Sequence, residues 1–234
     1  MLNDLIAISG LKGSGKNEAA NMLKYLLNAP KPFRRYFWYK LGLKFPSKWK
    51  ITSFAKPLKE VLSIILKTDV NKFEDRDFKE NYFVSVEISK IIEKELLEDE
   101  DILSDNKFTK LIKSGNPLPP DTWLSIRQLM QYFGTEVCRK WFGESIWINA
   151  TLNNISHPTI VSDLRFKNEF DRVKLLKGKT IYINRDICKP GTHASERELV
   201  ELYNQNKFDF VVNNNDTLKD LFNNLKNIIW QVEK

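Results

Sequence analysis

A glycine-rich run with one lysine near its end, Gly-Leu-Lys-Gly-Ser-Gly-Lys-Asn at residues 10–17, most constrains how this chain can fold. It follows the apolar residues 5–9 and precedes an amphipathic stretch at 17–27, which is the order strand, turn, helix. In that setting a G-x-x-x-x-G-K pattern predicts a phosphate-binding loop. Glycines let successive backbone N–H groups face one anion at a helix N-terminus, and Lys16 adds a mobile positive charge.

Asn17 departs from the general pattern, which has Ser or Thr after the lysine to bind Mg²⁺. A carboxylate elsewhere would then carry more of the metal binding. The alternative interpretation of the whole run is a glycine turn before a helix, with a lysine in solvent. The flanking apolar run and amphipathic stretch favour the phosphate loop.

Apolar runs that alternate with amphipathic stretches predict the rest of the fold. We expect further strands at 49–54, 159–163, 180–184 and 210–213. We expect helices at 86–97, 167–176 and 195–203. Further helices are expected to begin at Pro57, Thr135 and Thr217, another to follow a cap at Asp121, and another to contain Trp147. Residues 98–121 are typical of a surface excursion. This alternation predicts an α/β three-layer sandwich with a mostly parallel sheet of about five strands, covered on both faces.

Charge and composition narrow the class of protein. The net charge of +7 comes from residues 31–50, which hold seven Lys and Arg and no acid, while the remaining 30 basic residues balance 30 acidic ones. The segment is also rich in aromatic residues, so it could contact a nucleic acid or a membrane surface. We favour an insertion whose aromatic rings pack on the domain while its charges stay in water. Only two cysteines, no export signal and no membrane-length apolar run favour a reduced, cytoplasmic protein.

Charged residues after the predicted strands suggest the chemistry. Ligands of parallel sheets bind outside the carboxyl ends of the strands, where the glycine loop and Asp163-Leu164-Arg165 are both expected. Asp163 suits Mg²⁺, directly or through water, although a helix cap or turn role is the alternative. Cations at this edge could screen two phosphates held in line for phosphoryl transfer. The candidates are Lys16, Lys59, Arg127, Arg139, Arg165 and Arg185.

Several motifs in order along the chain resemble those of the phage-type deoxynucleoside monophosphate kinases. The most distinctive is IRQLMQYFGTE at 126–136, followed by Arg139 and Trp147. The others are ISGLKGSGK at 8–16, SFAKPLK at 53–59, DLRFKNE at 163–169, HASE at 193–196 and VNNNDTL at 212–218. Together they span nearly the whole chain, which is much more specific than the glycine loop alone.

The resemblance implies a single kinase domain over 1–234, with the basic aromatic insertion at 31–50 and a helical insertion at 70–155 for the acceptor nucleotide and lid. It implies transfer of the γ-phosphate of ATP to a (deoxy)nucleoside monophosphate, Mg²⁺, a homodimer, and the host cytoplasm if a phage encodes the chain. The insertion at 31–50 matches no feature of the family that we can name.

The resemblance also assigns roles to residues. Lys16, Arg127, Arg139, Asp163 and Arg165 would be catalytic, and Asp163 with Asn17 would hold the metal. The residues expected to bind ATP are Gly10, Lys12, Gly13, Ser14, Gly15, Lys16, Asn17 and Arg185. The residues expected to bind the acceptor are Lys59, Gln131, Trp147 and Asn168.

Two alternative functions stay open on the sequence. One is a P-loop ATPase that acts as a motor or switch, although further hydrolysis and partner-coupling motifs are not found. The other is a nucleic-acid-binding protein that uses the basic insertion at 31–50.

Overall fold

The computed structural model describes residues 4–85, 123–153, 155–189 and 194–232. The helix expected at 86–97, the excursion at 98–121, the cap at Asp121 and His193 lie outside these residues. The chain forms two compact units, Met1–Pro57 with Trp147–Lys234, and Leu58–Ile146. The expected arrangement, one kinase domain with insertions at 31–50 and 70–155, stays a prediction.

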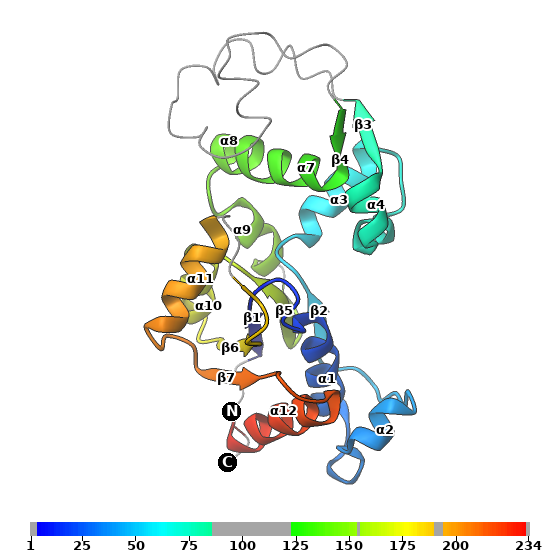
Figure 1. The fold of residues 1–234 in the computed structure, drawn as a ribbon, viewed down its shortest axis with the longest axis vertical. Coiled ribbons are helices and arrows are strands. Elements are labelled where there is room, and N and C mark those ends of the chain that lie inside the picture. The colour runs from blue at the N-terminus through cyan, green and yellow to red at the C-terminus, as the bar shows by residue number, and fades with distance from the viewer. Residues whose placement is uncertain (1–3, 86–122, 154, 190–193, 233–234) are drawn as a thin grey trace. The chain divides into compact units, whose positions relative to one another are not determined.

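The first unit is built on a parallel sheet (Figure 1). Its described strands are β1 (Leu5–Ser9), β2 (Lys50–Thr52), β5 (Thr159–Leu164), β6 (Lys179–Asn184) and β7 (Phe210–Asn213). They lie in the order β2-β5-β1-β6-β7, and every neighbouring pair is parallel. The expected five-stranded, mostly parallel sheet is confirmed. Its carboxyl edge therefore gathers the ends of all five described strands.

Helices cover both faces of this sheet. On one face lie α1 (Lys16–Asn28) and α12 (Leu218–Val232), which pack on Ile6, Ile8 and neighbouring side chains. On the other face lie α9 (Ile146–Leu152), α10 (Lys167–Leu175) and α11 (Ala194–Asn204), which pack on Leu5, Ala7 and their neighbours. Successive side chains of a strand point to opposite faces, so β1 contributes to both cores. The result is the expected three-layer α/β sandwich.

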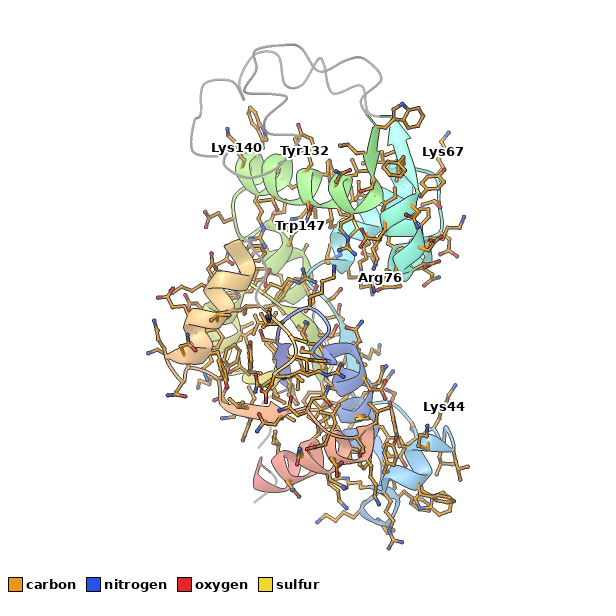
Figure 2. The ribbon with its side chains drawn as sticks, in the orientation of Figure 1. Lys44, Lys67, Arg76, Tyr132, Lys140 and Trp147 are labelled. Carbon is orange, nitrogen blue, oxygen red and sulfur yellow. The ribbon has the colours of Figure 1, made fainter. Side chains whose placement is uncertain are left out.

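The basic segment at 31–50 joins one of these cores through its rings. It contains the 3₁₀-helix η1 (Lys31–Phe33) and α2 (Tyr36–Lys40). Trp49 is buried, and Tyr36 and Tyr39 contact Phe222 of α12 with ring centroids 5.7 Å apart. Lys44 is exposed at the outer side of this segment (Figure 2). The favoured interpretation, packed rings with solvated charges, agrees with most of this arrangement. The exceptions are Arg34, which is buried and donates from Nε to Ala29 O, and Phe37, whose side chain is exposed.

The described part of the second unit consists of helices and one short antiparallel pair of strands. The helices are α3 (Lys56–Ile65), η2 (Val70–Glu74), α4 (Arg76–Asn81), α7 (Ile126–Gln131), the π-helix η4 (Tyr132–Arg139) and α8 (Lys140–Phe142). Strands β3 (Phe83–Ser85) and β4 (Trp123–Ser125) pair antiparallel.

Three expected boundaries were wrong. The second strand ends at Thr52 and not Phe54, because Phe54 and Ala55 turn to donate their N–H groups to Asp163. The helix expected after Asp121 begins at Ile126, since residues 123–125 form β4 and Ser125 makes a capping box with Gln128.

The third wrong boundary is the separate helix expected at Thr135. Helical structure instead continues from α7 through η4. A Cβ at the buried Gly134 would lie 2.8 Å from Leu58 Cδ2, so this glycine permits close packing on α3 and does not break the helix.

Candidate functional site

The glycine loop and Arg165 leave the sheet from neighbouring strands at the same edge. Ser9 at the end of β1 is in register with Leu164 at the end of β5, and Ser9 Oγ donates to Leu164 O at 3.0 Å. Gly10 is the first residue after β1, and Arg165 is the first residue after β5. Arg165 is exposed, and its guanidinium makes no ion pair within the part of the chain that is described.

Two glycines of the loop occupy positions that no other residue fits. Gly10 has φ +147°, and a Cβ there would lie 2.5 Å from Ile183 O. Gly15 has φ +94° and caps α1, and its Cβ would lie 2.5 Å from Asn214 Nδ2. The pattern at 10–17 therefore reflects a real backbone requirement: the chain curls tightly between β1 and α1.

Ser14 and Lys16 give this loop the groups that an anion needs. Ser14 is buried, and its Oγ has no hydrogen-bond partner among the described residues. Lys16 Nζ reaches back over the loop and donates to Gly10 O at 2.7 Å and Leu11 O at 2.6 Å. A buried unsatisfied hydroxyl beside an ammonium and a helix N-terminus is a chemically suitable place for phosphate oxygens.

The segments after β6 and β7 hold the loop from the side. Arg185 Nη1 donates to Gly13 O at 3.2 Å. Asn214, which is 8% exposed, donates from Nδ2 to Ser14 O at 2.8 Å, and its own N–H bonds Asn184 O. The sequence had suggested Arg185 but no role for Asn214. The run Asn213-Asn214-Asn215 directly after a predicted strand was the signal that could have pointed to it.

Asp163 ties the end of β5 to the turn after β2. Its Oδ1 accepts the N–H of Phe54 at 2.6 Å, and its Oδ2 accepts the N–H of Ala55 at 3.0 Å. The alternative interpretation of Asp163, a turn-forming residue, therefore describes contacts that it does make. Each carboxylate oxygen has a second lone pair, so these bonds do not exclude a metal ligand role.

Glu169 shapes the turn that presents Arg165. This glutamate is 2% exposed, and its Oε2 accepts the N–H groups of Arg165 at 2.8 Å and Phe166 at 3.1 Å. Asn168, a candidate for acceptor binding, is half-buried, and its Oδ1 accepts the N–H of Glu169 at 2.9 Å. The run 163–169 thus forms one connected turn from β5 into α10.

The remaining candidates of the first unit differ in exposure. Lys12 and Asn17 are exposed on the loop and in the first turn of α1. Trp147 is 7% exposed in α9 (Figure 2), so most of its ring serves packing. Among the described residues no group of three or more His, Cys, Asp or Glu could hold a metal ion. Mg²⁺ in phosphate sites usually takes one or two protein carboxylates, which Asp163 can provide.

Two of the four predicted residues of the second unit, Lys59 and Arg127, are paired with carboxylates. Lys59 is buried, and its Nζ lies 2.6 Å from Glu74 Oε1. Arg127 Nε and Nη2 each lie 2.8 Å from Glu80 Oε1. Gln131 is exposed at the end of α7, and Arg139 is half-buried in η4. Neither glutamate had been singled out from the sequence, since a pairing across more than ten residues leaves no local pattern.

A parallel sheet whose first strand runs through a glycine loop into a helix defines a P-loop nucleotide-binding protein. The sequence model of the deoxynucleotide monophosphate kinase family matches residues 59–225. The chain belongs to this family, and it is a nucleotide kinase, an enzyme that transfers a phosphoryl group.

Two individual proteins are similar to the chain. A curated protein of Acanthamoeba polyphaga mimivirus, named "Putative deoxynucleotide monophosphate kinase", is 28% identical over 239 residues, covering 94% of this chain and 93% of that protein. The solved dephospho-CoA kinase from Campylobacter jejuni aligns over 99% of this chain and 98% of its own, at 16% identity and a TM-score of 0.39. Within the described residues, no helix has the length and apolarity to cross a membrane.

Proposed function

We propose that the enzyme transfers the γ-phosphate of ATP to a deoxynucleoside monophosphate and releases ADP and the diphosphate. An acceptor phosphate oxygen attacks the γ-phosphorus, and the bond from that phosphorus to the β-phosphate oxygen breaks. The observation that best supports this proposal is the loop at residues 10–17, where the buried Ser14 Oγ lacks a described partner and Lys16 Nζ lies over the loop. Family membership supports the choice of acceptor.

The donor phosphates would lie in the glycine loop. Backbone N–H groups from Gly10 to Asn17 would face the phosphate oxygens, with Lys12 and Ser14 among the contacts. Lys16 would exchange its two loop carbonyls for phosphate oxygens, which are stronger acceptors because they are charged. Arg185, already bonded to Gly13 O, is close enough to the loop to contact the same nucleotide.

The acceptor and the transferred group would be held by arginines. Arg165 is well suited, since it follows β5 at the edge from which the loop leaves β1. Arg127 and Arg139 would bind the acceptor phosphate or the transferred phosphate, because one guanidinium can donate to two oxygens of the same phosphate. The further contacts proposed for the acceptor are Lys59, Gln131, Trp147 and Asn168. These roles rest on the family motifs.

Mg²⁺ would be held by Asp163 and Asn17, directly or through water, together with the ATP phosphates. Its chemical contribution would be to neutralise charge on the β- and γ-phosphates. Asp163 fits this role through its remaining lone pairs, and Asn17 through its exposed amide oxygen. We further propose a homodimer in the cytoplasm, where ATP and nucleoside monophosphates are both present.

The test is an ADP-release assay with ATP, Mg²⁺ and a panel of deoxynucleoside and ribonucleoside monophosphates. We expect at least one deoxynucleoside monophosphate to stimulate ADP production well above the rate with ATP alone. Product analysis must then show the matching diphosphate. The proposal is lost if folded protein binds ATP and no monophosphate raises the rate.

A further inference from the structure

The second unit contains three cations around two glutamates. Lys59 from α3 bonds the side chain of Glu74, and Lys79 from α4 donates to the backbone oxygen of the same glutamate at 3.3 Å. Arg127 from α7 bonds Glu80, the residue next to Lys79. Two amines therefore meet at one residue, and a guanidinium is anchored one residue along α4 from Lys79. Lys79 belongs to none of the motifs found in the sequence.

Lys79 differs from the other two cations in its partner. Within the described residues Lys59 pairs with Glu74 and Arg127 with Glu80, whereas Lys79 donates only to a backbone oxygen. Glu74 is largely in solvent, with 64% of its side chain exposed. The pKa of Lys79 is lowered, first because of burial and then because of the neighbouring charges of Lys59 and Arg127, against the opposing effect of Glu74 and Glu80. Lys79 thus stands in a positive field that an added anion would relieve.

The bonds of Arg127 to Glu80 do not use all of its N–H donors. Within the described residues its two bonds, from Nε and Nη2, both go to a single oxygen of Glu80. Its Nη1 makes no hydrogen bond within the part of the second unit that is described. Glu80 therefore orients the guanidinium without using all of its N–H groups, which is how a carboxylate positions an arginine for an oxyanion.

We propose that Lys59, Lys79 and Arg127 form the binding site for the phosphate monoester of the acceptor nucleotide, with Lys79 in direct contact with a phosphate oxygen. Glu80 is a positioning residue that holds Arg127 for this ligand. A phosphate monoester is a dianion with three terminal oxygens that such cations can bind, and a neutral nucleoside would gain nothing from them. The proposal rests on the proposed function, because its ligand is the acceptor of that reaction.

The first experiment measures binding of the best-accepted deoxynucleoside monophosphate by calorimetry without ATP, alongside the matching deoxynucleoside. For Lys79→Gln we expect the monophosphate Kd to rise roughly tenfold or more, the loss of one charged hydrogen bond. The deoxynucleoside Kd and the KM for ATP should be unchanged, and Lys79→Arg should restore most of the affinity. The matched control is Lys67→Gln, an exposed cation on the surface of the same unit (Figure 2).

An unchanged monophosphate Kd in a folded Lys79→Gln protein overturns the proposal. If that variant does not fold, acetylation of the wild-type lysines replaces it. The monophosphate should then protect Lys79 and Lys59 but not Lys67, and equal labelling of Lys79 with and without nucleotide contradicts the site. The ADP-release assay on wild-type enzyme tests the function separately. Normal turnover together with an unprotected Lys79 would therefore contradict this binding site but not the proposed function.

Discussion

Lys16 and Asp163, two residues that we propose act in the reaction, also make contacts that serve the fold. Lys16 lies over its own loop through two carbonyl contacts, and Asp163 accepts two backbone N–H groups from the turn after β2. A substitution at either residue therefore changes local structure and, on the proposed function, also the chemistry. Measurements of stability and of turnover are both needed to separate the two contributions.

Lys16→Ala should lower turnover by at least about 10²-fold, because a preorganised cation at the transferring phosphate is lost. The protein should still unfold cooperatively, since the lysine is only half-buried. Turnover in the ADP-release assay and urea unfolding give the two readouts. The control is Lys219→Ala, which removes an exposed lysine from α12. Equal activity in the two variants would mean that the loop does not bind the donor.

Asp163→Asn should reduce the free energy of unfolding by about 1–3 kcal/mol, because one carboxylate oxygen becomes an N–H₂ group that faces a backbone donor. If Asp163 also holds the metal, the Mg²⁺ concentration for half-maximal turnover should rise. Urea unfolding and an Mg²⁺ titration of activity measure the two effects. Asp171→Asn is the control, since Asp171 is an exposed partner of Lys167. A stability change no larger than that of the control contradicts the role of Asp163 in the turn.

At the scale of elements, Asp209 joins three segments of the first unit. It lies just before β7, and its carboxylate accepts from Lys174 of α10 and from the N–H and hydroxyl of Thr180 in β6. Burial alone would raise the pKa of Asp209, but the hydrogen bonds from Lys174 and Thr180 outweigh burial and lower it below its ordinary value of 3.8. The charged form is therefore the one that stabilises the fold.

Asp209→Asn should lower the free energy of unfolding at pH 7 by about 1–3 kcal/mol. Because the folded pKa is depressed, the contribution of the charge is present above the ordinary value of 3.8 and is lost as pH falls through the folded pKa. The difference in the free energy of unfolding between wild type and variant should therefore become smaller as the pH falls below the ordinary pKa of 3.8. Urea unfolding from pH 7 to pH 3 measures it, and a constant difference across the series would contradict the assignment.

The elements that could be predicted from the sequence were those with strong periodicity. The bounds of β1 and β7 agree with the expected strands, since apolar runs between turn residues leave little choice. The boundary between β4 and α7 could not be found, because the three residues 123–125 merge with the helical pattern that follows. Gly134 resembles a helix end in sequence, and only its contact with Leu58 explains why the helix continues.

At the scale of the whole molecule, the excess positive charge is concentrated at 31–50. The aromatic rings there that would stack on bases are partly used in packing, since Tyr36, Trp38, Tyr39 and Phe45 contact the core beside α1 and α12. Tyr39 also donates its hydroxyl to Glu18 at 2.9 Å, which fixes the segment to α1. The segment is therefore packed as part of the first unit, and six of its seven cations are exposed while Arg34 is buried.

From this we expect no saturable binding of a single-stranded oligonucleotide at physiological salt. Any binding at low salt should show a shallow dependence of log affinity on log salt. Fluorescence anisotropy over a salt series measures it, with Lys40→Gln/Lys44→Gln as the variant that removes two exposed cations. A slope of roughly −5, as expected for a single strand if all seven cations met phosphates, would favour a nucleic-acid partner after all.

The glycine loop, the alternation of strands and helices and the family motifs were determined by the sequence alone, because each depends on residues that are close together along the chain. The tertiary structure decided that β1 lies between β5 and β6, that Asn214 supports Ser14, that Glu80 pairs with Arg127, and that Lys59 pairs with Glu74. Contacts of this second kind join residues tens to hundreds of positions apart. They depend on the order of strands and the packing of helices, which a local pattern such as the Asn run at 213–215 can hint at but does not determine.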